Sequence, residues 1–131
     1  MESGTCELRL TRRYEATPAE VWRALTEPAS IARWLATPVD VELAPGGAFE
    51  LALPNDGRIH ARVREIELER VLELDWRYGG EQRSVVRFEL HAEDGGTVLV
   101  LDHGRIEAPL GMAYTSRWSS VLARLDAEIA P

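Results

Sequence analysis

His103 is the residue of this sequence best suited to act on a ligand. It lies two positions after Leu101 and four after Leu99 in an alternating stretch, so the three side chains point to the same face of a predicted strand. An imidazole on an apolar face can orient a ligand through a hydrogen bond or act as a general base. It can also be a structural histidine that bonds a backbone carbonyl. The structural role is favoured, and catalysis is the least favoured of the three.

Arg12 is the second residue whose position calls for a partner. It shares the apolar side of the first predicted strand, residues 7–15, with Leu8, Leu10 and Tyr14. A buried guanidinium without a partner is very costly. Arg12 must therefore pair with a carboxylate, reach solvent at the rim of the core, or meet an anionic ligand. Pairing with a carboxylate is the favoured alternative.

Other kinds of site have no support in the sequence. His60, His91 and His103 lack the spacing of metal ligands, and neither a metal nor an organic cofactor is predicted. A nucleophile elbow, a glycine-rich phosphate loop and a dinucleotide fingerprint are all missing. The acidic stretch over 65–75 has the pattern of an exposed strand face and a turn, whereas catalytic carboxylates converge in a cleft. The sequence therefore predicts no catalytic residue.

Hydrophobic periodicity and turn signals predict the elements that hold these residues. After the first strand, Thr17-Pro18-Ala19-Glu20 reads as a capping box with proline at the first helical position. A second short helix starts near Pro28, and a long amphipathic helix covers about 110–130. The turn near Glu69-Arg70 lacks glycine and proline. Six alternating strands lie between the short and the long helices, at 39–43, 49–53, 59–63, 72–76, 86–90 and 97–103.

This order predicts an α+β helix-grip fold of a single domain, residues 1–131. Short links favour antiparallel hairpins, which gives an antiparallel sheet of about seven strands with two short helices after strand one. An apolar sheet face must be covered, and the C-terminal helix is long enough to cross the sheet. The sheet is therefore expected to wrap around this helix.

Charge and composition narrow the partners. The net charge is −7, with 22 acidic and 15 basic residues, which argues against nucleic acid and against an anionic membrane surface. Cys6 is the single cysteine and cannot form an intrachain disulfide. The sequence has no secretory signal pattern and no apolar run of membrane-spanning length. A cytoplasmic protein is expected.

Several segments, in this order, resemble the START-like superfamily, also called SRPBCC. More narrowly, they resemble its branch related to the activator of the heat-shock protein 90 ATPase. The resemblance covers about 7–129. This chain departs from the usual sequence of the family at two places. Arg117 stands where a glycine often precedes Trp118, and the proline that is usual near Glu69 is missing. We expect a narrower or more charged cavity entrance at Arg117. The segments are LTRRYEATPAEVWRALTEP, ARWL, PGGAFEL, VLELDW, GGTVLVLDHG and RWSSVLARL.

The resemblance implies a cavity between the sheet and the long helix, which in relatives binds lipophilic or aromatic small molecules. We expect this chain to bind such a molecule without catalysis, with Trp34, Trp76 and Trp118 either lining the cavity or filling it. Two alternatives stay open. One is a co-chaperone-like interaction module with a protein partner or a homodimer, and the other is a cyclase- or hydrolase-type enzyme. The predicted lining is Trp34, Phe49, Leu51, Val63, Trp76, Phe88, Leu99, Leu101, His103, Tyr114, Trp118 and Leu122.

Overall fold

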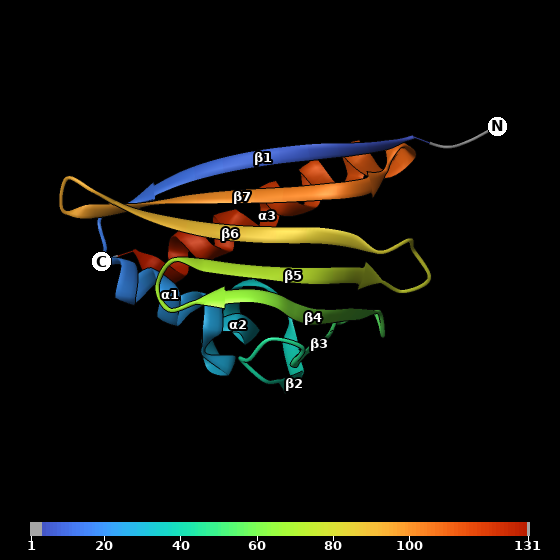
Figure 1. The fold of residues 1–131 in the computed structure, drawn as a ribbon, viewed down its shortest axis with the longest axis horizontal. Coiled ribbons are helices and arrows are strands. Elements are labelled where there is room, and N and C mark those ends of the chain that lie inside the picture. Colours follow the sequence, from blue (N-terminus) through green and yellow to red (C-terminus); the bar gives the residue numbers. More distant parts are fainter. Residues whose placement is uncertain (1–3, 131) are drawn as a thin grey trace.

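The sheet and three helices of the predicted fold are present in the computed structural model, which describes residues 4–130 (Figure 1). Seven antiparallel strands form one sheet in the order β1-β7-β6-β5-β4-β3-β2. The strands are β1 (Thr5–Tyr14), β2 (Thr37–Val41), β3 (Ala48–Ala52), β4 (Arg58–Glu67), β5 (Val71–Tyr78), β6 (Ser84–Glu93) and β7 (Gly96–Glu107). The helices are α1 (Pro18–Thr26), α2 (Pro28–Trp34) and α3 (Gly111–Ile129), with a short 3-10 turn at Ala108–Leu110.

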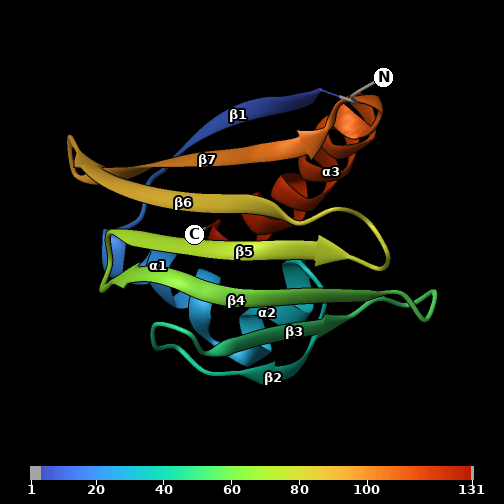
Figure 2. The ribbon, with the colours of Figure 1, turned by 45° about the vertical axis from the view of Figure 1, so that its right-hand side comes forward.

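The helices all lie on one side of the sheet. In Figures 1 and 2 they are behind the strands, and α3 crosses diagonally behind β7 and β6. The strands are therefore buried on the face toward the helices, and β7 alternates buried and half-buried positions along most of its length. This arrangement confirms the predicted α+β helix-grip fold.

Local chemistry sets the element boundaries. The backbone N–H of Glu20 donates to the Thr17 hydroxyl at 3.2 Å, and Pro18 occupies the first turn of α1, as the capping-box pattern predicts. The turn that the sequence marks poorly is made by Glu69, which has a φ of 62°. Only glycine adopts this left-handed conformation without cost, so the backbone conformation of Glu69 in the β4–β5 turn lowers the stability of the fold slightly.

Aromatic rings fill the space between sheet and helices. The Trp34 indole N–H donates to the Ala24 carbonyl at 2.7 Å, and its ring meets that of Phe88 edge-on with centroids 6.3 Å apart. The Trp118 ring lies 6.1 Å from Phe88 and 5.6 Å from Trp76. The centre of the molecule is therefore a packed core.

Helix α3 is fastened to its neighbours at both its apolar and its polar positions. Trp118 and Leu122 of its inner face are buried in the core. Near its C-terminal end, the Tyr14 hydroxyl of β1 donates to Asp126 at 2.8 Å. Arg33 of α2 pairs with Glu128, with Nη2 and Oε2 2.7 Å apart. These polar contacts join α3 to β1 and to α2.

Replacing Leu122 by alanine tests this packing. The side chain is 0% exposed, so we expect Leu122→Ala to lower the free energy of unfolding by about 2–5 kcal/mol through lost burial and a residual cavity. Met112 of the same helix is 89% exposed, and Met112→Ala should change it by less than about 0.5 kcal/mol. Urea denaturation measures both. Equal losses would contradict the inward placement of Leu122.

Candidate functional site

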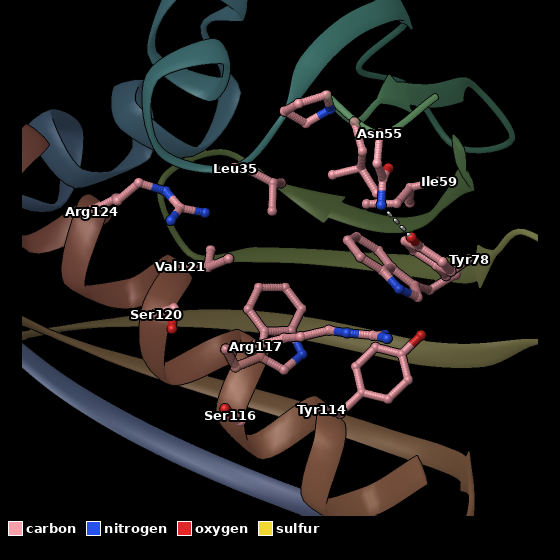
Figure 3. A pocket seen from close by; sticks show the side chains of 14 residues that line it. Leu35, Asn55, Ile59, Tyr78, Tyr114, Ser116, Arg117, Ser120, Val121 and Arg124 are labelled. Atoms are coloured by element: carbon pink, nitrogen blue, oxygen red, sulfur yellow. Dashed lines mark hydrogen bonds between the residues drawn. The ribbon is translucent and has the colours of Figure 1, made fainter. Parts of the chain in front are cut away.

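A pocket of about 510 Å³ opens along one side of α3 (Figure 3). Its volume is within the range of small-molecule sites. Its walls come from the residue after α2, the β3–β4 turn, the adjoining parts of β4 and β5, and α3. The lining residues are Leu35, Leu53, Pro54, Asn55, Ile59, Trp76, Tyr78, Tyr114, Ser116, Arg117, Trp118, Ser120, Val121 and Arg124.

Trp76 carries an unsatisfied donor at this pocket. Its side chain is 3% exposed, and its Nε1 finds no hydrogen-bond partner within residues 4–130. Burial raises the pKa of the nearby Tyr114 phenol, which the Trp76 N–H opposes only in part, and the two groups form no hydrogen bond. A buried donor left without an acceptor costs free energy, so this N–H would be stabilised by an acceptor that residues 4–130 do not supply.

Arg117 and Tyr114 form a polar cluster at one end of the pocket. The Tyr114 hydroxyl donates to the Glu81 carboxylate. Burial and this hydrogen bond raise the pKa of Tyr114, so the phenol stays protonated. The Arg117 guanidinium carbon is 5.0 Å from the Tyr78 ring centroid and 5.1 Å from that of Tyr114, as cation–π contacts require. Figure 3 shows the Arg117 side chain extending toward the Tyr114 ring.

His103 is fully engaged by other side chains. It is 0% exposed, and the Trp118 indole N–H donates to its Nδ1 at 2.9 Å. The neutral ring therefore carries its proton on Nε2, which donates to the Ser84 hydroxyl at 2.7 Å. The Ser84 hydroxyl is in turn 3.4 Å from the Trp76 carbonyl oxygen. His103 thus has a structural position, with two side chains in place of the backbone carbonyl expected from the sequence.

The predicted lining residues divide into two groups. Trp76, Tyr114 and Trp118 line the pocket. The other nine lie in the packed core away from this pocket, and a contact between them and a ligand stays a prediction. The nine are Trp34, Phe49, Leu51, Val63, Phe88, Leu99, Leu101, His103 and Leu122.

Arg12 and Arg117 lie near carboxylates. Arg12 is half-buried, with its Nε 3.8 Å from Asp126 Oδ2, a long contact with the kind of partner that sequence analysis favours. Arg117 Nη1 is 3.9 Å from Glu81 Oε2. Since Arg117 also lines the pocket, it adds charge where the sequence predicts a more charged entrance.

Several pocket residues were not predicted. Ser116, Ser120 and Arg124 lie outside the apolar arc of the helix, and they are exposed as that position predicts. What the sequence does not show is that this exposed face borders a pocket. Asn55 belongs to a segment with the composition of a turn, which hides its place in the pocket wall. The available signal was the spacing of Arg117, Val121 and Arg124 by four and then three residues, which places them along one side of the helix.

Residues 4–130 contain neither a candidate metal site nor a candidate membrane-spanning helix. This part of the chain holds no group of three or more histidine, cysteine, aspartate or glutamate residues that could bind a metal ion. None of its helices has the length and apolarity to span a membrane.

Comparison with known proteins identifies the family. The model of the family described as "Activator of Hsp90 ATPase homolog 1-like protein" matches residues 15–130. The chain belongs to this family. The predicted resemblance is thereby confirmed. Curated proteins gave no match.

Solved structures share the helix-grip fold of this family member. Protein MLL2253 from Mesorhizobium loti is 25% identical with a TM-score of 0.85, over 94% of this chain and 96% of that one. CalU16 from Micromonospora echinospora is 28% identical with a TM-score of 0.82, over 99% and 86%. DynU16, a putative protein in the dynemicin biosynthetic locus, is 19% identical with a TM-score of 0.84, over 92% and 46%. The last likeness shows the fold alone.

The buried His103 makes stability depend on pH. Burial lowers its pKa from 6.5 to about 4, so between these values the unfolded chain binds a proton that the folded chain does not. The free energy of unfolding should therefore fall as pH drops from 6.5 to 4, by about 3 kcal/mol from this residue. His103→Gln should be less stable at pH 7 because Gln cannot reproduce the packed ring, and its stability should vary less over this window.

Urea denaturation across this pH range measures the effect. His91→Gln is the control for removing a histidine, because His91 is an exposed residue of β6 outside the core, and it should retain the loss of stability that His103 causes at low pH. If His103→Gln also kept the full dependence, the neutral, buried His103 would be refuted.

Proposed function

We propose that this chain binds a small lipophilic or aromatic molecule in the pocket beside α3. The observation that carries the proposal is an open pocket of about 510 Å³ with tryptophan walls, Trp76 and Trp118, in front of a filled core. Apolar burial at about 25 cal/mol per Å² would supply most of the binding free energy. Leu35, Ile59 and Val121 extend the apolar surface.

The unsatisfied indole N–H of Trp76 supports a ligand that also carries an acceptor. Ligand sites combine apolar walls with a few placed polar groups, and a buried donor without a partner fits this pattern. The Nε1 atom itself is buried, so a bound acceptor would reach it only after a neighbouring side chain moves.

The lining favours binding over catalysis. Its fourteen residues, all within the described part of the chain, include no aspartate, glutamate, histidine or cysteine. Tyr114 stays protonated because its pKa is raised, and both nitrogens of His103 are occupied. General acid–base work needs a group that can exchange a proton with the substrate.

Native mass spectrometry of the protein purified from its own host tests the proposal. We expect an adduct of defined mass that is lost on denaturation. Val121→Phe should remove most of the adduct, because the larger ring occupies the pocket. Ala123→Phe places the same ring on an exposed part of α3 outside the pocket and should retain the adduct.

A clean apo mass would contradict the proposal if a lipophilic library also left the melting temperature unchanged. The same result would favour the protein-interaction alternative. That alternative predicts a partner whose capture is unaffected by Val121→Phe.

A further inference from the structure

The charge of the pocket is opposite to that of the chain. The sequence has a net charge of −7, yet the pocket is lined by two arginines, Arg117 and Arg124, and by no carboxylate among the described residues. Arg117 and Arg124 are both exposed residues at the open side of the pocket. The pocket therefore presents positive charge to an entering ligand beside its apolar walls.

Arg124 is held in place by the chain without being neutralised. Its Nε donates to the Trp34 carbonyl at 3.2 Å, and none of the ion pairs within residues 4–130 involves it. The backbone bond uses one donor of the guanidinium and leaves the terminal nitrogens without a protein partner there. Figure 3 shows the Arg124 side chain pointing from α3 toward Leu35, above Val121.

Arg117 differs from Arg124 in its surroundings. It lies between two tyrosine rings and 3.9 Å from Glu81, so part of its charge is already compensated. The two arginines are seven residues apart, or roughly 10 Å along the helix axis. An anion entering the pocket meets an uncompensated charge at Arg124, at the end away from Glu81.

Ser120 adds a hydroxyl beside Arg124. The two residues are one helical turn apart and therefore neighbours on the helix surface. Both line the pocket. In the described chain the Ser120 hydroxyl makes no hydrogen bond, whereas the hydroxyls of Thr115 and Ser119 bond backbone carbonyls of α3. Ser120 can thus donate to a ligand oxygen that Arg124 also holds.

We propose that the pocket selects a planar aromatic carboxylate, with the carboxylate on Arg124 and Ser120 and the ring system against Val121, Trp118 and Trp76. This inference rests on the proposed function and names the class of its ligand. A guanidinium fork matches a carboxylate with two parallel hydrogen bonds. The tryptophan walls fit a flat apolar body.

Matched acids and esters test the inference. Aromatic carboxylates from benzoate to pyrenecarboxylate, and their methyl esters, are titrated into the full chain by isothermal calorimetry. The best acid should bind about tenfold more tightly than its ester, since a hydrogen bond to a charged group contributes about 1.5–3 kcal/mol. Added salt should weaken binding of the acid and leave the ester unchanged.

Arg124→Gln locates the anion site. It should abolish the preference for the acid and leave the affinity for the ester unchanged. Arg70→Gln is the control, because it removes the same charge from an exposed arginine in the β4–β5 turn, at the opposite end of β5 from Tyr78. It should keep the preference. Circular dichroism confirms that both variants are folded.

Three other results are possible, and each would contradict a different part of the proposal. If acid and ester bind equally, the carboxylate inference is wrong and the lipophilic pocket stands. If the preference for the acid survives Arg124→Gln, the assignment to Arg124 is wrong. If no compound of either kind binds, the proposed function itself fails, and the inference fails with it.

Discussion

The hydrogen bond from Trp118 to His103 is the contact on which the arrangement of α3 depends. A buried indole N–H must find an acceptor, and His103 provides one from β7 at 2.9 Å. Because Nδ1 accepts this bond, the ring proton is on Nε2, which forms a second hydrogen bond to Ser84 of β6. The polar groups of the core thus join the helix to two strands, and they do so only while the imidazole is neutral. The position of α3 along the sheet follows from this pairing.

The position of α3 also decides where the protein has empty space. Trp118 and Leu122 fill the centre of the sheet–helix interface, so space remains at the flank of the helix, where the β3–β4 turn and Leu35 complete the wall. Trp118 serves both regions, because its buried ring packs in the core and also lines the pocket. The segment ARWL is divided in the same way, with Trp34 in the core and Leu35 at the pocket.

Sequence periodicity predicted the elements and their inner faces because burial leaves a regular trace. The inward parity of His103, the capping box at Thr17 and the amphipathic face of α3 all agree with the structure. The position of the empty space leaves no such trace. Leu101 lies in the filled core and Trp76 lies beside a pocket, yet both are apolar residues at inward positions of an alternating strand. Arg124 is exposed, as its position outside the apolar arc predicts, but its place in the pocket wall depends on α2 and the β3–β4 turn, which complete that wall only after folding.

The contacts between α3 and α2 bear on which part of the pocket wall is held in place. Arg33 pairs with Glu128, and Arg124 donates to the carbonyl of Trp34, so the parts of the wall that come from α2 and α3 are joined to each other. Within residues 4–130 the β3–β4 turn has no comparable tie, since its side-chain contact across the pocket is the 3.5 Å approach of Asn55 to the Tyr78 hydroxyl. The β3–β4 turn is therefore the part of the pocket wall that can change conformation with the smallest loss of side-chain contacts.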